Sequence, residues 1–325
     1  MTEEIAGTAD TNNEIKKPKA TRDAYGETLL ELGKKNPDIV ALDADLSGST
    51  KTSKFAKAFP DRFFNMGISE QDMIGTAAGL ALTGKVPFAS TFAVFETGRA
   101  WDQIRLTVCY SNTNVKLVAT HGGITVGEDG ASHQALEDIA IMRALPNMSV
   151  IVPADATETT RVIQYIADYK GPVYVRLGRA KVPYVMPDHY EFRLGKAHVF
   201  HIGRDANIIA AGVMVDIAKR AAKALHKEGL DIGVINMSTI KPLDEDTILE
   251  AATASKLIIT AEEHSIIGGL GGSICEFLSE RHPMPVRRIG INDSFGCSGG
   301  GGELLKFHGL TAENIIHTVK NTLGK

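Results

Sequence analysis

Two imidazoles and two carboxylates are concentrated in one stretch, "ATHGGITVGEDGASHQ", at residues 119–134. These groups are His121, Glu128, Asp129 and His133, and they lie among glycines directly after a predicted strand. Histidine titrates near neutral pH, and glycine lets a backbone approach a ligand or take a positive φ. The spacing matches neither H-x3-H nor H-E-x-x-H, the patterns of many zinc sites. We therefore expect a loop that handles protons and a polar substrate, and we expect no metal ligands in this chain.

A further candidate is Glu70, in "NMGISEQDMIGTAAGLAL" at residues 65–82, where an extended segment turns into a helix. Ser69 is a suitable N-cap and approximates a capping box with Asp72, so a first-turn glutamate there needs no functional reason. Burial would instead favour a carboxyl group that shares a proton with a ligand. Three apolar neighbours favour burial: Met66, Ile68 and Ile74. The residue types leave both interpretations open.

The elements that position these groups alternate between short apolar runs and helical periodicity. Because the runs lack a period of two, they indicate parallel strands covered on both faces. The expected strands of the first half are "DIVALDADL", "RFFNMGI", "VPFASTFA", "NVKLVATHG", "SVIVPA" and "PVYVRLG". Helices are expected at residues 22–37, 69–83, 96–110 and 156–169, and a second alternating set begins near Asn207.

A chain of 325 residues exceeds one average domain. We expect two doubly wound, mostly parallel α/β domains. The polar residues 1–19 predict a flexible tail, residues 20–185 the first domain, residues 186–204 a linker with weak periodicity, and residues 205–325 the second domain. In such sheets ligands bind outside the carboxyl ends of the strands. The loops after Leu42, Ile68, Ala89 and Thr120 should therefore form one rim, and they carry most of the unusual residues.

Composition excludes several other classes of protein. The net charge of −4 gives no basic footprint for nucleic acid, and the three cysteines form no C-x-x-C pair. No stretch has the pattern of a signal peptide or the length of a membrane span, so we expect a cytoplasmic protein. The tracts "GGLGGS" and "GCSGGGG" lack the G-x-G-x-x-G pattern of a nucleotide site and predict tight loops.

The motifs together resemble a known family. "THGGITVGEDGASHQ" is similar to the H-x5-G-E-D-G-x-x-H-Q signature of transketolases, and "GISEQ", "STFAVF" and "GRAKVP" follow the same family in order and spacing. The resemblance runs from about Arg22 to the C-terminus. It implies thiamine diphosphate as cofactor, and transfer of a two-carbon ketol unit from a ketose phosphate to an aldose phosphate in the pentose phosphate pathway. Glu70 matches the glutamate that bonds the pyrimidine ring nitrogen.

The same resemblance assigns further residues. Phe92 and Phe95 match the aromatic pocket for the pyrimidine, although spacing alone favours two core residues; Gly98 stands where many transketolases have another aromatic. Asp45 matches a position near the cofactor. Arg22, Ser49, His121 and Arg179 match the phosphate end of the substrate, with Arg176 as a competitor of Arg179. Asp129 matches the family residue that contacts a hydroxyl group of the donor sugar. His133, like His121, matches a residue that binds a substrate oxygen or transfers its proton.

One part of the family pattern is missing from the sequence. The G-D-G motif followed by asparagine, which holds the diphosphate and a divalent metal, has no counterpart here. The resemblance therefore implies the C-terminal subunit of a split transketolase. An N-terminal partner subunit would hold Mg or Ca, and two copies of each chain would form a heterotetramer.

Four alternatives compete with this interpretation. The beta subunit of a 2-oxo acid dehydrogenase decarboxylase component also pairs such a glutamate motif with a C-terminal domain, but its loops do not usually contain "GEDGASHQ". A deoxyxylulose-phosphate synthase is similar but is normally one long chain. A catalytically idle regulatory or binding subunit would not need the charged loop residues, and a nicotinamide dehydrogenase would need the missing glycine fingerprint.

Overall fold

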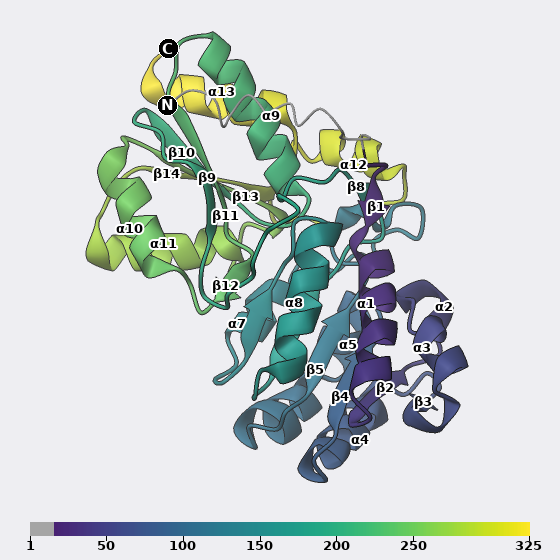
Figure 1. Cartoon of the computed structure of the whole chain (residues 1–325). Coiled ribbons are helices and arrows are strands. Elements are labelled where there is room, and N and C mark those ends of the chain that lie inside the picture. The colour runs from purple at the N-terminus through teal and green to yellow at the C-terminus, as the bar shows by residue number, and fades with distance from the viewer. Residues whose placement is uncertain (1–15) are drawn as a thin grey trace.

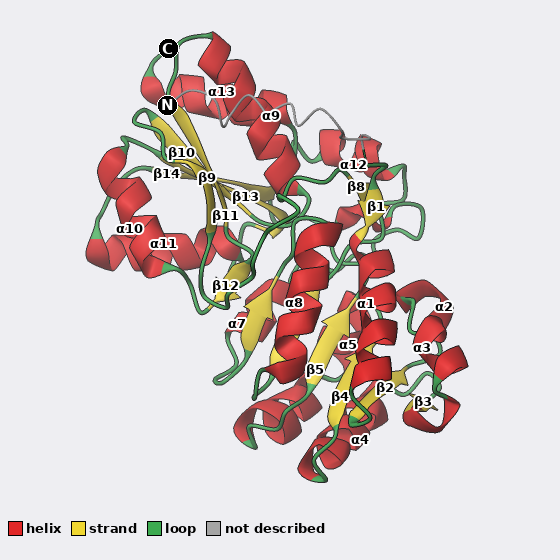
Figure 2. Ribbon diagram, in the orientation of Figure 1, coloured by secondary structure: helices red, strands yellow, loops and turns green. Residues whose placement is uncertain are grey.

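The computed structural model describes residues 16–325, which form two α/β units (Figures 1 and 2). Most of the predicted tail lies outside the described residues. Its last residue, Lys19, belongs instead to β1 (Lys19–Ala20), which pairs antiparallel with β8 (Lys181–Val182). This small ribbon fastens the start of the chain beside the segment that carries Arg179. The prediction of a tail that extends through Lys19 was wrong at this point.

The first unit is built on a seven-stranded sheet whose strands are parallel except for the edge strand β12. Its order is β12 (Thr239–Lys241), β6 (Ser149–Ile151), β7 (Val173–Arg176), β5 (Lys116–Ala119), β4 (Val86–Ser90), β2 (Ile39–Asp43) and β3 (Phe63–Asn65). Its main helices are α1 (Thr21–Lys35), α4 (Glu70–Leu82), α5 (Ala93–Arg99), α7 (Asp138–Arg143) and α8 (Ala156–Asp168). Shorter helical segments are α2 (Ser47–Thr50), α3 (Ser53–Ala58), η1 (Pro60–Arg62), α6 (Trp101–Gln103), the π-helix η2 (Ile104–Tyr110) and η3 (Ile124–Val126).

Both faces of this sheet are covered, which explains the apolar runs without alternation. In β2, Ile39 and Ala41 belong to a core with Leu29 of α1 and Val162 of α8. Val40 and Leu42 belong to the opposite core, which includes Met73 and Ile74 of α4. Successive side chains of a strand point to opposite faces, so a strand buried on both sides has no polar face.

The second unit has a five-stranded sheet with one antiparallel edge strand, β9. Its order is β14 (Val286–Ile291), β13 (Ile258–Ser265), β10 (Ala206–Ala210), β11 (Ile232–Asn236) and β9 (His198–His201). The helices are α9 (Met214–Lys227), α10 (Glu245–Ala254), α11 (Leu270–Arg281), α12 (Gly301–Phe307) and α13 (Ala312–Leu323). The predicted fold class, two mostly parallel α/β domains, is confirmed.

The two units share structure across the predicted linker. Strand β9 lies inside the range 186–204, and β12 leaves the second half of the chain to pair with β6 of the first sheet. The core that contains Leu42 and Met73 continues into the second unit through Ile235 and Met237. Because a close-packed core resists deformation, a shared core of this kind fixes the loops of one unit in position relative to the other unit.

Two helix starts differ in detail from the sequence prediction. Ser69 precedes α4 as expected, but its side chain makes no capping hydrogen bond, so the predicted capping box was wrong. The helix expected at 96–110 begins at Ala93, because Phe92 is still extended. It is interrupted at Ala100, and the short helix α6 and the π-helix η2 follow. Among residues 16–325, no helix combines the length and apolarity that crossing a membrane requires.

Candidate active site

The candidate residues gather at one edge of the first sheet, where its parallel strands end. β2 ends before Asp45 and Ser49, β4 before Phe92, and β5 before His121. The parallel pairing of these strands places their carboxyl ends together. The residues that follow the strands on this rim are Asp45, Ser49, Glu70, Phe92, Phe95, His121, Asp129, His133 and Arg179, and α1 brings Arg22 to them.

Arg22 joins two of the other candidates directly. Its Nη1 donates to the Ser49 carbonyl oxygen at 3.0 Å and lies 3.2 Å from His121 Nε2. Its buried Nε has no hydrogen-bond partner in the described part of the chain. Burial lowers the pKa of Arg22, with a smaller contribution from Arg179. An arginine with an unpartnered buried donor can supply a further hydrogen bond when an anion binds at the rim.

His121 is a neutral, fixed acceptor. Burial, followed by the positive charges of Arg22 and Arg179, lowers the pKa of His121 to about 3. With Nε2 facing the Arg22 guanidinium, we assign the proton to Nδ1, which lies 2.8 Å from Thr120 Oγ1. Its backbone has φ +59°, a left-handed conformation that is uncommon outside glycine and that turns the ring inward.

An aromatic wall lies beside these groups. The Phe92 and Phe95 rings are nearly parallel at 5.7 Å, and the His121 ring stacks on Phe92 at 3.7 Å. His133 meets Phe95 edge-on at 5.3 Å. A Cβ atom placed on Gly98 would meet no atom of the described chain within 4 Å. No other side chain of the described chain fills the space that an aromatic residue at this position would begin to occupy. The wall suits a flat heterocycle.

Glu70 is buried, as its apolar neighbours suggested, but a cation that the sequence reasoning missed holds it. The side chain is 6% exposed, and Oε1 accepts a hydrogen bond from Arg99 Nη1 at 2.6 Å. The Arg99 guanidinium also lies over the Phe95 ring at 4.0 Å from its centroid. Ile68, expected to help bury Glu70, is 75% exposed. Arg99 therefore stabilises the carboxylate form of Glu70 at the base of the aromatic wall.

The structure separates Arg176 from Arg179. Arg176 is buried and donates from Nε to Asp138 Oδ2 at 2.8 Å, so its hydrogen bonds are made within the chain. Arg179 is partly exposed and donates to the Val126 carbonyl oxygen and, at 3.0 Å, to Glu128. Arg22, Arg179 and Glu128 line one hollow of about 450 Å³ at the rim. Arg179 is thus the arginine available to an entering anion.

Two sequence candidates make no contact with the others. Asp45 is exposed, has φ +62°, and pairs with Asn65, whose Nδ2 donates to Asp45 Oδ1 at 3.2 Å. Asp129 is exposed in the loop between Gly127 and Gly130. Both are exposed at the rim and outside the buried cluster.

The loop glycines have a packing role that the sequence could not reveal. A Cβ atom on Gly122 would lie 2.7 Å from Arg176 Nε, and one on Gly123 would lie 2.3 Å from the carboxyl carbon of Glu263. Glu263 of β13 accepts a hydrogen bond from the Thr125 N–H at 2.6 Å. The glycines therefore let side chains of the protein itself, and not a ligand, approach the backbone.

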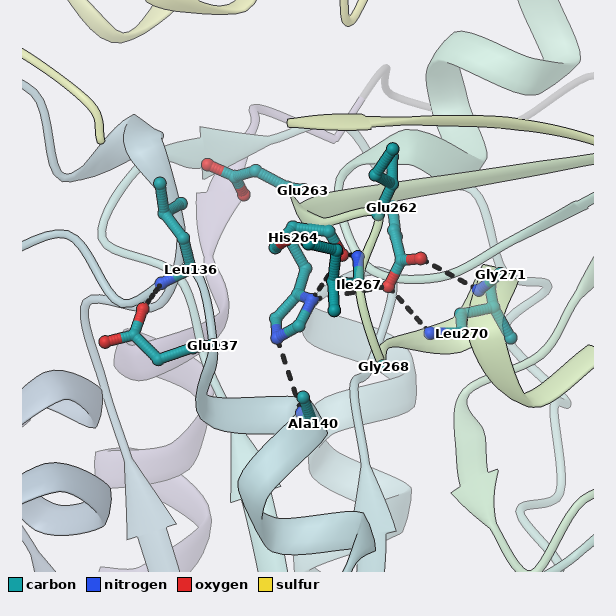
Figure 3. Close-up of polar contacts among 12 residues, drawn as sticks. Leu136, Glu137, Ala140, Glu262, Glu263, His264, Ile267, Gly268, Leu270 and Gly271 are labelled. Carbon is teal, nitrogen blue, oxygen red and sulfur yellow. Dashed lines mark hydrogen bonds and ion pairs between the residues drawn. The ribbon is translucent and has the colours of Figure 1, made fainter. Parts of the chain in front are cut away.

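Figure 3 shows the second-unit groups that support this loop. Glu262 accepts hydrogen bonds from the N–H groups of Leu270 and Gly271 at the start of α11. His264 Nε2 accepts from the Ala140 N–H of α7 at 3.4 Å, and the Ser265 N–H donates to the Leu136 carbonyl oxygen at 2.8 Å. The end of β13 is thus fixed to the loop and helix that follow His133.

Two buried carboxyl groups near Glu70 also escaped the sequence reasoning. Asp43, at the end of β2, accepts hydrogen bonds from Thr50, Thr52 and the Leu46 N–H, yet burial raises the pKa of Asp43 to about 6. Glu96, on α5, is fully buried. A carboxylate near the start of a short helix is unremarkable in a sequence. Only the fold shows that Asp43, Glu70 and Glu96 are neighbours.

A possible ligand set for a metal lies elsewhere. Within residues 16–325, one group of three brings ligand atoms of His201, His226 and Asp231 within 4.8 Å of one another. It lies in the second unit, and Arg204 already donates to Asp231 at 2.9 Å. The guanidinium charge opposes a bound cation, so the group has no evident part in the rim's chemistry.

Comparison with known proteins defines the class. The model of the transketolase pyrimidine-binding domain matches residues 17–185, and that of the transketolase C-terminal domain matches residues 195–315. The chain is 52% identical over 310 residues to a transketolase C-terminal section of Methanocaldococcus jannaschii, covering 94% of this chain and 97% of that protein. It is 43% identical over 300 residues to one subunit of the apulose-4-phosphate transketolase of Phocaeicola vulgatus, covering 92% and 96%.

A solved structure agrees. A split gene transketolase, described as an inactive β4 tetramer, superimposes with a TM-score of 0.87 at 52% identity, covering 94% of this chain and 98% of that chain. The chain belongs to the transketolase family, which confirms the resemblance of the loop motifs.

Proposed function

We propose that this chain is the C-terminal subunit of a two-subunit transketolase that transfers a two-carbon ketol unit between sugar phosphates. One observation carries the proposal: buried Glu70, the Phe92–Phe95 wall and the Arg22–His121 pair lie on a single sheet edge. An acid, an aromatic surface and an anion-binding cluster are the groups that a flat charged cofactor and a phosphorylated substrate require.

The chain's own residues suit one end of thiamine diphosphate. Phe92 and Phe95 offer ring faces to the pyrimidine, and Arg99 occupies Oε1 of Glu70, which leaves Oε2 for the pyrimidine ring nitrogen. When bound, the cofactor supplies the thiazolium carbanion that attacks a ketose. Glu70 holds and returns the proton on the ring nitrogen, and burial of its carboxylate keeps water from competing for that hydrogen bond.

The substrate's phosphate would lie against Arg22 and Arg179. Two guanidinium groups on one hollow attract a dianion, and the unpartnered Arg22 Nε is a donor that phosphate oxygens could satisfy. His121 keeps Arg22 in place as a neutral acceptor, and Ser49 does so through its carbonyl oxygen. Asp129 and His133, at the outer loop, would contact hydroxyl groups of the donor sugar.

A separate chain would complete the site. The diphosphate and its Mg or Ca ion would be held by an N-terminal subunit with the G-D-G motif that this sequence lacks. Two subunits of each kind would form a heterotetramer. The description of the related split gene transketolase as an inactive β4 tetramer supports this proposal, because an isolated C-terminal subunit would lack half of the cofactor site.

Reconstitution tests the proposal. The purified chain alone should not convert xylulose 5-phosphate and ribose 5-phosphate, and addition of the N-terminal subunit and thiamine diphosphate should restore turnover. Glu70→Gln should abolish that turnover, because an amide cannot hold the proton, whereas Glu250→Gln on the exposed face of α10 should not. Normal turnover by Glu70→Gln would refute the assigned role.

The substrate distinguishes the remaining functions. Pyruvate as a donor would indicate a 2-oxo acid decarboxylase or a deoxyxylulose-phosphate synthase. The Arg22–Arg179 hollow argues against the decarboxylase alone, because a 2-oxo acid carries no phosphate for it to bind. The Phocaeicola vulgatus relative is named for apulose 4-phosphate, so branched ketose phosphates belong in the same panel of donors. An idle subunit would support no turnover with any donor in the reconstituted assembly.

A further inference from the structure

Glu96 is a fully buried carboxyl group whose oxygens have no partner. Its exposure is 0%, and neither Oε1 nor Oε2 accepts or donates a hydrogen bond within the described residues. Buried ionised carboxylates are normally paired with a cation or with several N–H donors, because the desolvation of a lone charge is costly. An orphaned carboxyl in this position therefore needs a physical explanation.

The neighbours of Glu96 oppose a negative charge. Burial raises the pKa of Glu96 well above its ordinary value, and the charges of Asp43 and Glu70 raise it further. Asp43 comes from the end of β2, and Glu70 from the start of α4. Two buried hydroxyls, Tyr25 of α1 and Tyr174 of β7, also sense the charge of Glu96.

The three carboxyl groups of the cluster differ in their partners. Glu70 has the Arg99 guanidinium, three residues beyond Glu96 on the same helix. Asp43 has two hydroxyl donors and one N–H donor. Glu96 has none of these, although the charges of both Asp43 and Glu70 reach it. The proton in this cluster should therefore reside on Glu96, while Glu70 keeps its charge.

We propose that Glu96 is a positioning residue that retains a proton in the folded chain and thereby keeps Glu70 a carboxylate ready to accept the proton of the cofactor's ring nitrogen. The proposal rests on the proposed function for the role of Glu70, but not for the location of the proton. If Glu96 were to ionise, a second negative charge would appear beside Glu70, and the cluster as a whole would favour the uptake of another proton. The cluster then no longer presents a free acceptor at Oε2.

Unfolding of the isolated chain locates the proton. Unfolded Glu96 titrates at the ordinary pKa of about 4.3. Because its folded pKa is raised, the folded chain binds a proton that the unfolded chain releases. The stabilisation is full below the unfolded pKa and is lost as pH rises toward the folded pKa. Relative to Glu96→Gln, the unfolding constant of the wild type should increase about tenfold per pH unit across this range.

A matched control isolates the effect. Glu250→Gln, on an exposed surface, should keep the pH dependence of the wild type. An infrared difference spectrum of wild type minus Glu96→Gln at neutral pH should show the carbonyl stretch of a protonated carboxylic acid. An unfolding constant with the same pH dependence in Glu96→Gln and wild type, or no such band, would overturn the proposal.

A further variant tests the coupling to Glu70 without any turnover. Glu70→Gln removes one of the charges that oppose ionisation of Glu96, so the acid band should disappear at a lower pH than in the wild type. An unchanged midpoint would show that the two groups do not sense each other, and it would overturn the positioning role. Both measurements use the chain alone, so they decide the proposal even if no transketolase substrate is found.

In a reconstituted enzyme, the permanently neutral Glu96→Gln should retain kcat near neutral pH and should move the alkaline limb of the pH profile to higher pH. Loss of kcat at all pH values, with an unchanged alkaline limb, would instead indicate a role in packing alone. Absence of turnover in the wild type would count against the proposed function, and the spectra of the isolated chain would still decide where the proton lies.

Discussion

Replacement of Arg176 by methionine should destabilise the chain strongly, because it leaves a buried acid without its cation. The Arg176 and Asp138 side chains are 5% and 0% exposed, and Nε donates to Asp138 Oδ2 at 2.8 Å. Arg176 Nη2 also donates to the carbonyl oxygens of Ala135 and Glu263, at 2.9 and 3.0 Å. Loss of one partner of a buried pair costs about 3–5 kcal/mol. Asp138 retains the Tyr174 hydroxyl at 2.6 Å, which favours the lower end.

Urea unfolding measures this loss, followed by the fluorescence of Trp101, the chain's one tryptophan, and by far-UV circular dichroism. Trp101 Nε1 donates to the Ile141 carbonyl oxygen of α7, the helix that carries Asp138, so the probe lies close to the change. The double variant Arg176→Met/Asp138→Asn should lose less than the sum of the single variants by about 1–3 kcal/mol, because each single variant strands the other partner.

An exposed pair provides the control. Arg220 donates to Asp216 at 3.0 Å on the surface of α9, one turn apart, and Arg220→Met should cost about 0.5 kcal/mol or less. A loss below about 1 kcal/mol for Arg176→Met, comparable to that of the exposed pair, would refute the reasoning that loss of the cation strands a buried acid.

Three other experiments, two substitutions and one NMR titration, test separate parts of the structure. Gly123→Ala places a Cβ atom against the Glu263 carboxyl group at φ +83° and should cost about 1–3 kcal/mol more in unfolding free energy than Gly229→Ala, which has φ +84° and open space. His121 should show constant ring NMR shifts between about pH 5 and pH 8 because its pKa is lowered to about 3; titration in that range would contradict its neutral role. Asp155→Ala should lower the unfolding free energy by about 2 kcal/mol, since Asp155 caps α8 and accepts from the Val185 and Met186 N–H groups; an unchanged urea midpoint would contradict this.

The alternation of elements was predictable because a strand buried on both faces must be apolar throughout. The run that became β2 shows this, with Ile39 and Leu42 in different cores. The pairing of β12 with β6 was not predictable, since three residues of the second half join the first sheet through contacts that no local pattern encodes. The start of α8 at Ala156 was predicted correctly, whereas α5 begins at Ala93, three residues before the predicted position, and no side-chain cap marks its start.

The site was predictable where motifs recur in a family and unpredictable where burial decides. Arg176 and Arg179 are three residues apart and have the same side chain, yet one is buried in an ion pair and the other faces the rim hollow. A signal was available: Arg176 ends the apolar run "VYVR", and a charge at the end of a fully buried strand requires a partner. Arg99 and Glu96 gave no such signal, because both occur in an ordinary amphipathic stretch.

The C-terminal unit acquires a role from these contacts even though it contributes no residue to the aromatic wall. The loop that carries His121 and His133 is rich in glycine and would be mobile in isolation. Glu263 holds the Thr125 N–H, and the Cys297 carbonyl oxygen accepts from Gln134 Nε2 at 2.9 Å. Both partners come from the second unit, so the positions of the histidines depend on contacts made outside the unit that carries them. Preorganisation of a flexible loop by a rigid support lowers the entropy that binding would otherwise lose.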